Sequence, residues 1–424
     1  MAKSSRATPI GPADNLPDAY RALEKDLGDR ELFDAYYVER ADSPAERLET
    51  QLRTSDTICH VLYLGQPKSG KTTELLRLAR KIEDKYFVVF LSALEDMEPS
   101  DVKPIDLLLL SATRLYEQAA KEGVKVGPDI EKDLRDWLLQ NSGETFRTTI
   151  KEKTKGGGVE AGLKVVVAKL GGSFRVDSTL REEIRTRLAP RVADLCDKIE
   201  ILCAKIQQKL GREPLVIIDD LEKIDLATQE VLFHKHAATL STPGCMTIYT
   251  ASKAMCYLPS WTMVKASFPA PVEVPSIRTS TRDGGPFPPG LDLLRSILLK
   301  RMKAGLLVPE ALDKLVTICN GVLSDLFAVC KTCCLEAIAE RAAQITWQMV
   351  DRNHQSLTDD FRRMIHSECY HMLGKVHATR TAEVSKALSE LMQMQAVIEY
   401  KDEKGIYYDV HPAVVPLLPV KSAK

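Results

Sequence analysis

The stretch "GQPKSGKTT" has the spacing of a phosphate-binding loop, because Gly65 is followed after four residues by Gly70, Lys71 and Thr72. Glycines at these places let successive backbone N–H groups point at one phosphate. Lys71 would reach the β- and γ-phosphates, and Thr72 would offer its hydroxyl to Mg²⁺. The loop is therefore predicted to hold a nucleoside triphosphate. The predicted contacts are Gly65, Gln66, Pro67, Lys68, Ser69, Gly70, Lys71, Thr72 and Thr73.

The residues around this loop supply the strand and the helix that it needs. The preceding "ICHVLYL" is short, apolar and rich in β-branched and aromatic residues, as a buried strand should be. The following "TTELLRLARKIEDK" repeats apolar residues with a helical period. A glycine turn without a ligand would have the same flanks, but the full motif in this setting favours phosphate binding.

A group of carboxylates follows a second buried strand. Residues 215 to 218 are four consecutive apolar residues, typical of a parallel strand covered on both faces. Ligands bind at the carboxyl ends of such strands, where Asp219 would hold Mg²⁺ with Thr72. Asp220 is the candidate for orienting or deprotonating the attacking water, with Glu222 as the second candidate. Lys71, Asp220 and Glu222 form the predicted catalytic set in the loop region.

Three further strands and two hydroxyls complete the expected sheet. Residues 246 to 250 form the next predicted strand, and Thr250 and Ser252 lie at its end. These hydroxyls could position the attacking water, although an ordinary strand threonine with a serine turn is the alternative. Residues 86 to 93 and 270 to 278 are predicted as the other strands.

Taken in order, these segments resemble the AAA+/STAND division of P-loop ATPases, particularly bacterial NACHT and Orc/Cdc-like proteins. The matching segments are "GQPKSGKTTELLRLA", "IDLLLLSATRLYEQ", "PLVIIDDLEKID", "CMTIYTASKAM" and "ICNGVLSDLFAVCKTCCLEAI". The resemblance implies an α/β P-loop NTPase core with a parallel sheet sandwiched by helices, an all-helical lid and a C-terminal winged helix. It also implies ATP and Mg²⁺ as cofactors and a homo-oligomer joined through the nucleotide site.

The sequence departs from this division at its arginines. The lid stretch from Gly321 to Asp325 lacks the basic residue that commonly touches the γ-phosphate in the group. Arg278 and Arg282, after the last predicted strand, are the candidates for a catalytic arginine acting on a neighbouring subunit, with ordinary surface arginines as the alternative.

Changes in composition along the chain predict four parts and one insert. Residues 141 to 178 are rich in glycine and lysine, and alternating apolar residues from Val159 to Val167 suggest a β-hairpin turning near Gly171 and Gly172. We expect this insert to be an arm that contacts partners. The predicted parts are a disordered N-terminus (1–18), the ATPase core (19–285), the helical lid (286–355) and the winged helix (356–424).

The composition limits the class of protein. The chain has 424 residues and a net charge of −1, so no strong overall field attracts nucleic acid. Its apolar runs are too short to span a membrane, and its ten scattered cysteines, including "CKTCC", fit buried free thiols better than a zinc site. The sequence therefore predicts a cytoplasmic protein.

The sequence is compatible with two functions. Residues 356 to 424 contain nine Lys or Arg and nine Asp or Glu, and the helix expected over residues 381 to 395 has no arginine. DNA binders need phosphate-neutralising charge, so a protein-interaction domain is favoured. The leading hypothesis is a slow or partner-stimulated ATPase switch that regulates a protein encoded elsewhere, in bacterial signalling or anti-phage defence. The alternative is a DNA-associated AAA+ ATPase, such as a loader or a transposition or replication regulator.

Overall fold

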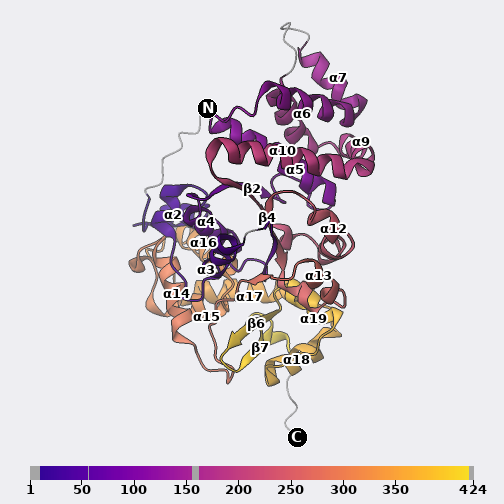
Figure 1. Cartoon of the computed structure of the whole chain (residues 1–424). Coiled ribbons are helices and arrows are strands. Elements are labelled where there is room, and N and C mark those ends of the chain that lie inside the picture. Colours follow the sequence, from indigo (N-terminus) through magenta and orange to yellow (C-terminus); the bar gives the residue numbers. More distant parts are fainter. Residues whose placement is uncertain (1–9, 56, 155–161, 420–424) are drawn as a thin grey trace.

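The computed structural model describes residues 10–55, 57–154 and 162–419, and the other residues are drawn in grey in Figure 1. At its centre lies a parallel sheet of five strands in the order β2-β3-β4-β1-β5. The strands are β1 His60–Gly65, β2 Tyr86–Ser92, β3 Glu213–Asp219, β4 Met246–Ser252 and β5 Val272–Glu273. The predicted strands are therefore present, but the last is only two residues long, because the prolines on both sides of it cannot donate to a ladder.

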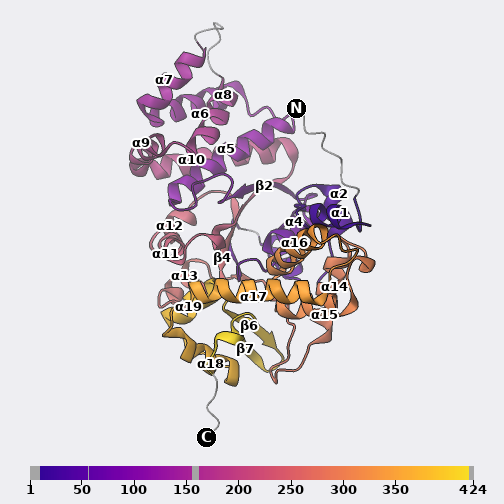
Figure 2. The same cartoon turned by 180° about the vertical axis from the view of Figure 1, so that it is seen from behind.

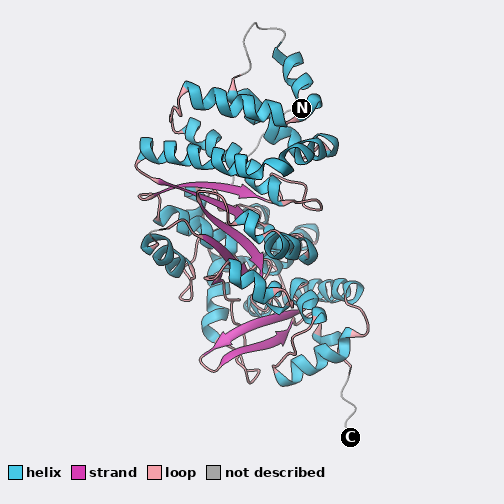
Figure 3. Cartoon of the chain, turned by 45° about the vertical axis from the view of Figure 1, so that its right-hand side comes forward, coloured by secondary structure: helices cyan, strands magenta, loops and turns pink. Residues whose placement is uncertain are grey.

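Helices cover both faces of this sheet (Figure 3). The odd-numbered residues from Phe87 to Leu91 pack toward one face, and the even-numbered residues from Tyr86 to Phe90 toward the other, as strand geometry requires. The first face carries α5 Pro104–Lys121, α10 Val192–Leu210, α12 Ala237–Leu240 and α13 Trp261–Ser267. The second carries α3 Ala45–Thr54 and α4 Lys71–Lys81. Short segments link the strands: η2 Leu221–Lys223, α11 Leu226–Glu230, η3 Val231–Lys235 and η4 Lys253–Tyr257.

The insert is helical, so the predicted β-hairpin over residues 141 to 178 is wrong. Its apolar residues Leu163, Val166, Val167 and Leu170 repeat at helical spacing and are all buried. The glycines that suggested a turn lie inside one helix, and part of the alternating pattern lies outside the described residues. The elements are α6 Pro128–Asn141, α7 Gly143–Thr154, α8 Leu163–Phe174, α9 Ser178–Leu188 and η1 Ala189–Arg191. They stack above α5 and α10 at the top of Figure 1.

The lid is helical, as expected, and the N-terminal segment belongs to it. Its helices are α14 Pro288–Leu299, η5 Ala304–Leu306, α15 Pro309–Ile318, α16 Leu323–Ala339 and the first part of α17 Trp347–Met364. Buried cysteines, including Cys330, Cys333 and Cys334, pack in its core as small apolar side chains. The helix α1 Leu16–Leu23 packs against α16, and α2 Arg30–Tyr36 follows. The prediction of disorder over residues 1 to 18 is thus wrong for residues 10 to 18, and residues 1 to 9 lie outside the described chain.

The C-terminal part is a winged helix. It contains α18 Cys369–Thr379, α19 Lys386–Gln393, β6 Val397–Asp402, β7 Gly405–Val410 and η6 Val415–Leu417, with β6 and β7 antiparallel. The predicted boundary between residues 355 and 356 falls inside α17, which runs from the lid to the winged helix in Figure 2. One continuous helix therefore connects the two parts. In the described chain, no helix is both long and apolar enough to cross a membrane.

Candidate nucleotide-binding site

The phosphate-binding loop runs from the end of β1 to the start of α4. Gly70 precedes the helix with φ 88°, a conformation that glycine adopts without strain. Gly65 is needed for a different reason, because a Cβ there would lie 2.9 Å from Ser69 Oγ and 3.1 Å from the Lys71 side chain. The loop and the helix N-terminus that the sequence predicted are thus in place, with Thr72 and Thr73 in the first turn of α4.

Lys71 is almost fully buried and is held by the loop itself. Its Nζ donates to Gln66 O at 2.7 Å and Gly65 O at 3.2 Å, and lies 3.2 Å from Glu222 Oε1. Burial lowers the pKa of Lys71, while the Glu222 carboxylate acts in the opposite direction. The ammonium group that would contact phosphates is therefore paired with chain atoms that a phosphate could replace.

The carboxylates beyond β3 converge as the sequence predicted. Asp219, Asp220 and Glu222 each place an oxygen within 4.8 Å of the other two. Burial, followed by the charges of Glu222 and Asp220, raises the pKa of Asp219 to about 6, against a hydrogen bond from Thr72. Asp219 Oδ1 and Glu222 Oε2 are buried without a hydrogen-bond partner in the described chain. Orphaned carboxylate oxygens beside a threonine hydroxyl fit a hard cation such as Mg²⁺.

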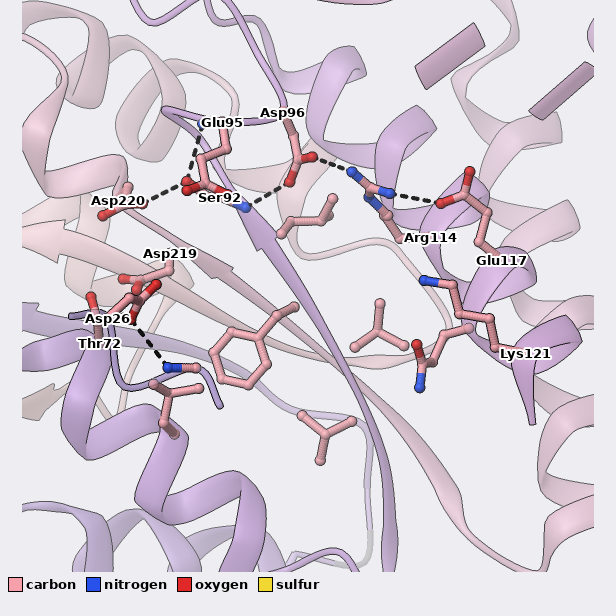
Figure 4. A pocket seen from close by; sticks show the side chains of 17 residues that line it. Asp26, Thr72, Ser92, Glu95, Asp96, Arg114, Glu117, Lys121, Asp219 and Asp220 are labelled. Atoms are coloured by element: carbon pink, nitrogen blue, oxygen red, sulfur yellow. Dashed lines mark hydrogen bonds and ion pairs between the residues drawn. The ribbon is translucent and has the colours of Figure 1, made fainter. Parts of the chain in front are cut away.

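The two candidates for the catalytic base differ in what already holds them. Asp220 has a left-handed backbone with φ 66°, accepts a hydrogen bond from Ser92 Oγ at 2.6 Å and forms an ion pair with Lys223. Figure 4 shows Asp220 turned toward Ser92 and away from Thr72, while Asp219 faces Thr72. Glu222 is committed to Lys71. Both oxygens of Asp220 thus already have a partner, whereas Glu222 keeps Oε2 without a hydrogen-bond partner in the described chain.

The hydroxyls at the end of β4 have structural partners. Thr250 Oγ1 accepts from Leu221 N at 3.1 Å and donates to Ile218 O at 3.4 Å, so it fixes the segment that carries Glu222. Ser252 Oγ donates to Gln393 Oε1 at 2.5 Å, which directs it toward α19. These contacts indicate that both hydroxyls help to position the site. The predicted contact of Thr250 and Ser252 with the attacking water stays a prediction.

The structure does not bring Arg278 and Arg282 to the loop of their own chain. The Arg278 guanidinium stacks 3.5 Å from the centre of the Phe287 ring. Arg282 makes two hydrogen bonds to Asp402, at 2.8 and 3.1 Å, and a third to Gly405 O at 3.0 Å. Arg282 therefore holds the β6–β7 turn, and Arg278 is the less constrained of the two candidates for action on a neighbour.

The winged helix contacts the phosphate-binding loop directly, which no pattern in the sequence indicated. Gln66 Nε2 donates to Val397 O at 2.8 Å, and Gln66 Oε1 accepts from Glu399 N at 3.2 Å. Gln395 Nε2 donates to Pro67 O at 2.6 Å. The side chain of a loop residue thus pairs with β6 as another strand would. These partners are more than 300 positions apart, so no local pattern announces them.

Three more contacts join the core, the lid and the winged helix around this loop. Gln393 Nε2, at the end of α19, donates to Glu222 O at 2.9 Å beside the acidic cluster. Asp325 of the lid lies 3.6 Å from Lys68 Nζ and 3.4 Å from His411 Nε2. Asp325 therefore lies where the loop, the lid and the winged helix meet.

Comparison with known proteins finds remote structural likeness. No protein-family model and no curated protein matches the sequence. Solved structures with a similar course include the Aeropyrum pernix Orc1 protein in complex with DNA, at 12% identity and TM-score 0.40, covering 92% of this chain and 93% of that chain. Others are Cdc6p from Pyrobaculum aerophilum (12%, TM-score 0.38, 91% and 95%) and the Thermotoga maritima RuvB Holliday junction branch migration motor (11%, TM-score 0.36, 87% and 91%).

The parts implied by the sequence resemblance are present in the chain. They are the α/β core with a phosphate-binding loop, the helical lid and the winged helix. At these low identities and TM-scores, the chemistry of the site rests on the residues of this chain alone.

Proposed function

We propose that the chain is an ATP-binding and ATP-hydrolysing switch of the AAA+/STAND type, whose winged helix responds to the state of the phosphate-binding loop. One observation carries the proposal: Gln66, inside the loop, is bonded to β6 through both ends of its amide. A nucleotide that reorders the loop would therefore change the contact that holds the C-terminal domain.

The residues of the loop suggest how the change begins. Lys71 would leave the carbonyl oxygens of Gly65 and Gln66 and its pair with Glu222 to contact phosphates. Mg²⁺, held by Thr72 and Asp219, would neutralise charge on the phosphates. Glu222 would then be free of Lys71, and Asp220 or Glu222 would take the proton from the attacking water. Release of Gln66 O loosens the loop at the residue whose side chain holds β6.

The first test is ATP binding by Lys71→Ala, measured by calorimetry with Mg²⁺. Loss of contacts from a buried charge costs about 1.5–3 kcal/mol each, so we expect affinity to fall about tenfold or more. Lys81→Ala, at the far end of the same helix, is the matched control and should bind as the wild type does. Equal affinity in both variants would refute nucleotide binding at this loop.

The partner is proposed to be a protein, as in signalling or defence systems, and the active form a homo-oligomer that shares the nucleotide site. Gln393, which could have read bases from α19, instead contacts the acidic segment of the core, and the C-terminal part has no net charge. Fluorescence anisotropy with a labelled duplex across a salt series tests the DNA-associated alternative. Tight binding with a steep salt dependence would promote that alternative.

A further inference from the structure

The strand β2 has one edge that no other strand of the described chain covers, because it ends the sheet. Its hydrogen bonds to β3 use the odd-numbered residues, as shown by Glu213 N to Lys85 O at 2.9 Å and Ala93 N to Asp219 O at 2.9 Å. In a strand, the N–H and C=O of one residue point to the same side, and successive residues alternate. Val88 and Phe90 therefore direct both backbone groups outward.

A groove follows this edge along the whole strand. A cavity of about 550 Å³ is lined by Leu76, Val88 and Phe90, and it reaches Thr72 and Asp219 at the nucleotide site. A second cavity of about 250 Å³ shares Leu76, Val88 and Phe90 and continues to the start of β2. The five consecutive residues from Val88 to Ser92 all line the first cavity, so the strand's edge itself is exposed to it.

The walls of the groove limit what can enter. The groove is lined by Leu76 of α4 and by Arg114, Glu117 and Lys121 of α5 (Figure 4). The helices α4 and α5 cover opposite faces of the sheet. A single extended chain fits between such walls, whereas a second sheet with its own flanking helices would meet them. Seven residues of β2 give a groove of about 23 Å at 3.3 Å per residue.

The charges in the groove are unequal. The first cavity has six acidic residues and two basic ones, and Arg114 is already paired with Asp96 and Glu117. The acidic side chains gather at the end beside the nucleotide site: Asp26, Glu95, Asp96, Asp219 and Asp220. The half-buried apolar floor made by Leu76, Val88 and Phe90 lies further along. The groove thus offers strand pairing and an apolar floor, with negative charge at one end.

We propose that this edge binds an extended peptide of a partner protein by strand addition, with apolar side chains on the floor and an arginine or lysine at the acidic end. Main-chain hydrogen bonds to Val88 and Phe90 would supply affinity, and the acidic end would select the sequence. The inference deepens the proposed function, because it gives the partner's chemistry. Binding of the peptide itself requires no nucleotide.

The test uses the full chain without nucleotide and a fluorescein-labelled octapeptide of alternating valine and threonine with an arginine at each end. Val88→Pro removes an outward backbone N–H and leaves the ladder to β3 intact. Val88→Thr keeps that backbone N–H and has a side chain of the same shape. We expect saturable binding that Val88→Pro weakens about tenfold and Val88→Thr changes by less than about threefold.

A second variant keeps the test decisive if Val88→Pro fails to fold, as judged by circular dichroism. Glu95→Lys should weaken the arginine-ended peptide and strengthen a glutamate-ended one by a few-fold each. Absence of saturable binding, or binding that both variants leave unchanged, would overturn the proposal. Self-association that Val88→Pro abolishes would overturn it too, because a second copy would then be the occupant. A protein that binds ATP but not the peptide would refute only this inference.

Discussion

The phosphate-binding loop has two sides with opposite hydrogen-bonding states. On the side proposed for Mg²⁺, which we call the metal side, Asp219 Oδ1 and Glu222 Oε2 are buried without hydrogen-bond partners in the described chain. On the C-terminal side, the Gln66 amide is satisfied at both ends, by Val397 O and Glu399 N. An unsatisfied buried polar group costs about 1–3 kcal/mol, so the first side is unfavourable until something binds there. One side of the loop is therefore suited to an external ligand, and the other to a domain of the same chain.

The largest effect should come from the base on the metal side. Asp220→Asn should keep ATP binding, because the Lys71 and Asp219 contacts remain, but slow hydrolysis by about 10²- to 10⁴-fold. Steady-state phosphate release measures the change. Asp197→Asn, an exposed aspartate on α10, is the matched control and should turn over normally.

Glu222→Gln separates the two carboxylates. If Asp220→Asn turns over normally and Glu222→Gln does not, Glu222 is the base, and its pair with Lys71 is a resting contact. Normal turnover in both variants would remove the acidic cluster from the mechanism and leave the metal side without a catalytic role.

A second prediction concerns pH and stability without nucleotide. The pKa of Asp219 is about 6 in the folded chain and near 3.8 when unperturbed, so the folded protein binds more protons between these values. Stability contributed by this group therefore falls as the pH rises through that window. Asp219→Asn should remove the cost and raise the free energy of unfolding near pH 7.5 by up to about 3 kcal/mol.

Urea unfolding at about pH 4 and pH 7.5 measures this effect, since the variant should differ little from the wild type at the lower pH. The same variant should lose Mg²⁺-dependent binding of ATP. An equal stability difference at both pH values would show that the charged Asp219 carboxylate carries no cost in the folded chain. The metal side would then be as well satisfied as the C-terminal side.

The same contrast explains how much the sequence could predict. The loop and the carboxylates after β3 follow from short motifs whose chemistry and fold position are linked, so the convergence of Asp219, Asp220 and Glu222 was predictable. The insert was not, because Leu163, Val165 and Val167 alternate while Leu163, Val166 and Val167 also fit a helix. These residues satisfy both a strand period and a helical period. Burial of Leu163, Val166 and Val167 shows that the chain adopts the helical one.

The C-terminal contacts could not be predicted for a different reason. Gln393 and Gln395 have side chains that read DNA bases as readily as they bond carbonyl oxygens. Only the three-dimensional arrangement shows that they donate to Glu222 O and Pro67 O. Likewise, nothing near Arg282 in the sequence indicates Asp402 as its partner. Contacts between residues more than 100 positions apart leave no local spacing that a motif could record.

The smallest predicted effect tests the C-terminal side of the loop. Gln66→Ala removes one acceptor and one donor from β6, and a typical net hydrogen bond contributes about 1 kcal/mol. Hydrogen exchange at the Glu399 amide, which donates to Gln66 Oε1, should therefore rise about fivefold to tenfold. Gln344→Ala is the matched control, since Gln344 also donates to a backbone oxygen, Gly305 O at 2.9 Å, but in the lid.

Addition of ATP and Mg²⁺ to the wild-type protein then connects the two sides. If ligand on the metal side draws Lys71 away from Gln66 O, exchange at Glu399 should rise in the wild type and change little further in Gln66→Ala. Such non-additivity is expected only when the nucleotide acts through the Gln66 contact. If ATP raises exchange equally in both proteins, the nucleotide loosens the winged helix by another route, such as the Lys68–Asp325–His411 contacts. If ATP leaves exchange unchanged in the wild type, the two sides of the loop are independent and the C-terminal contact is only structural.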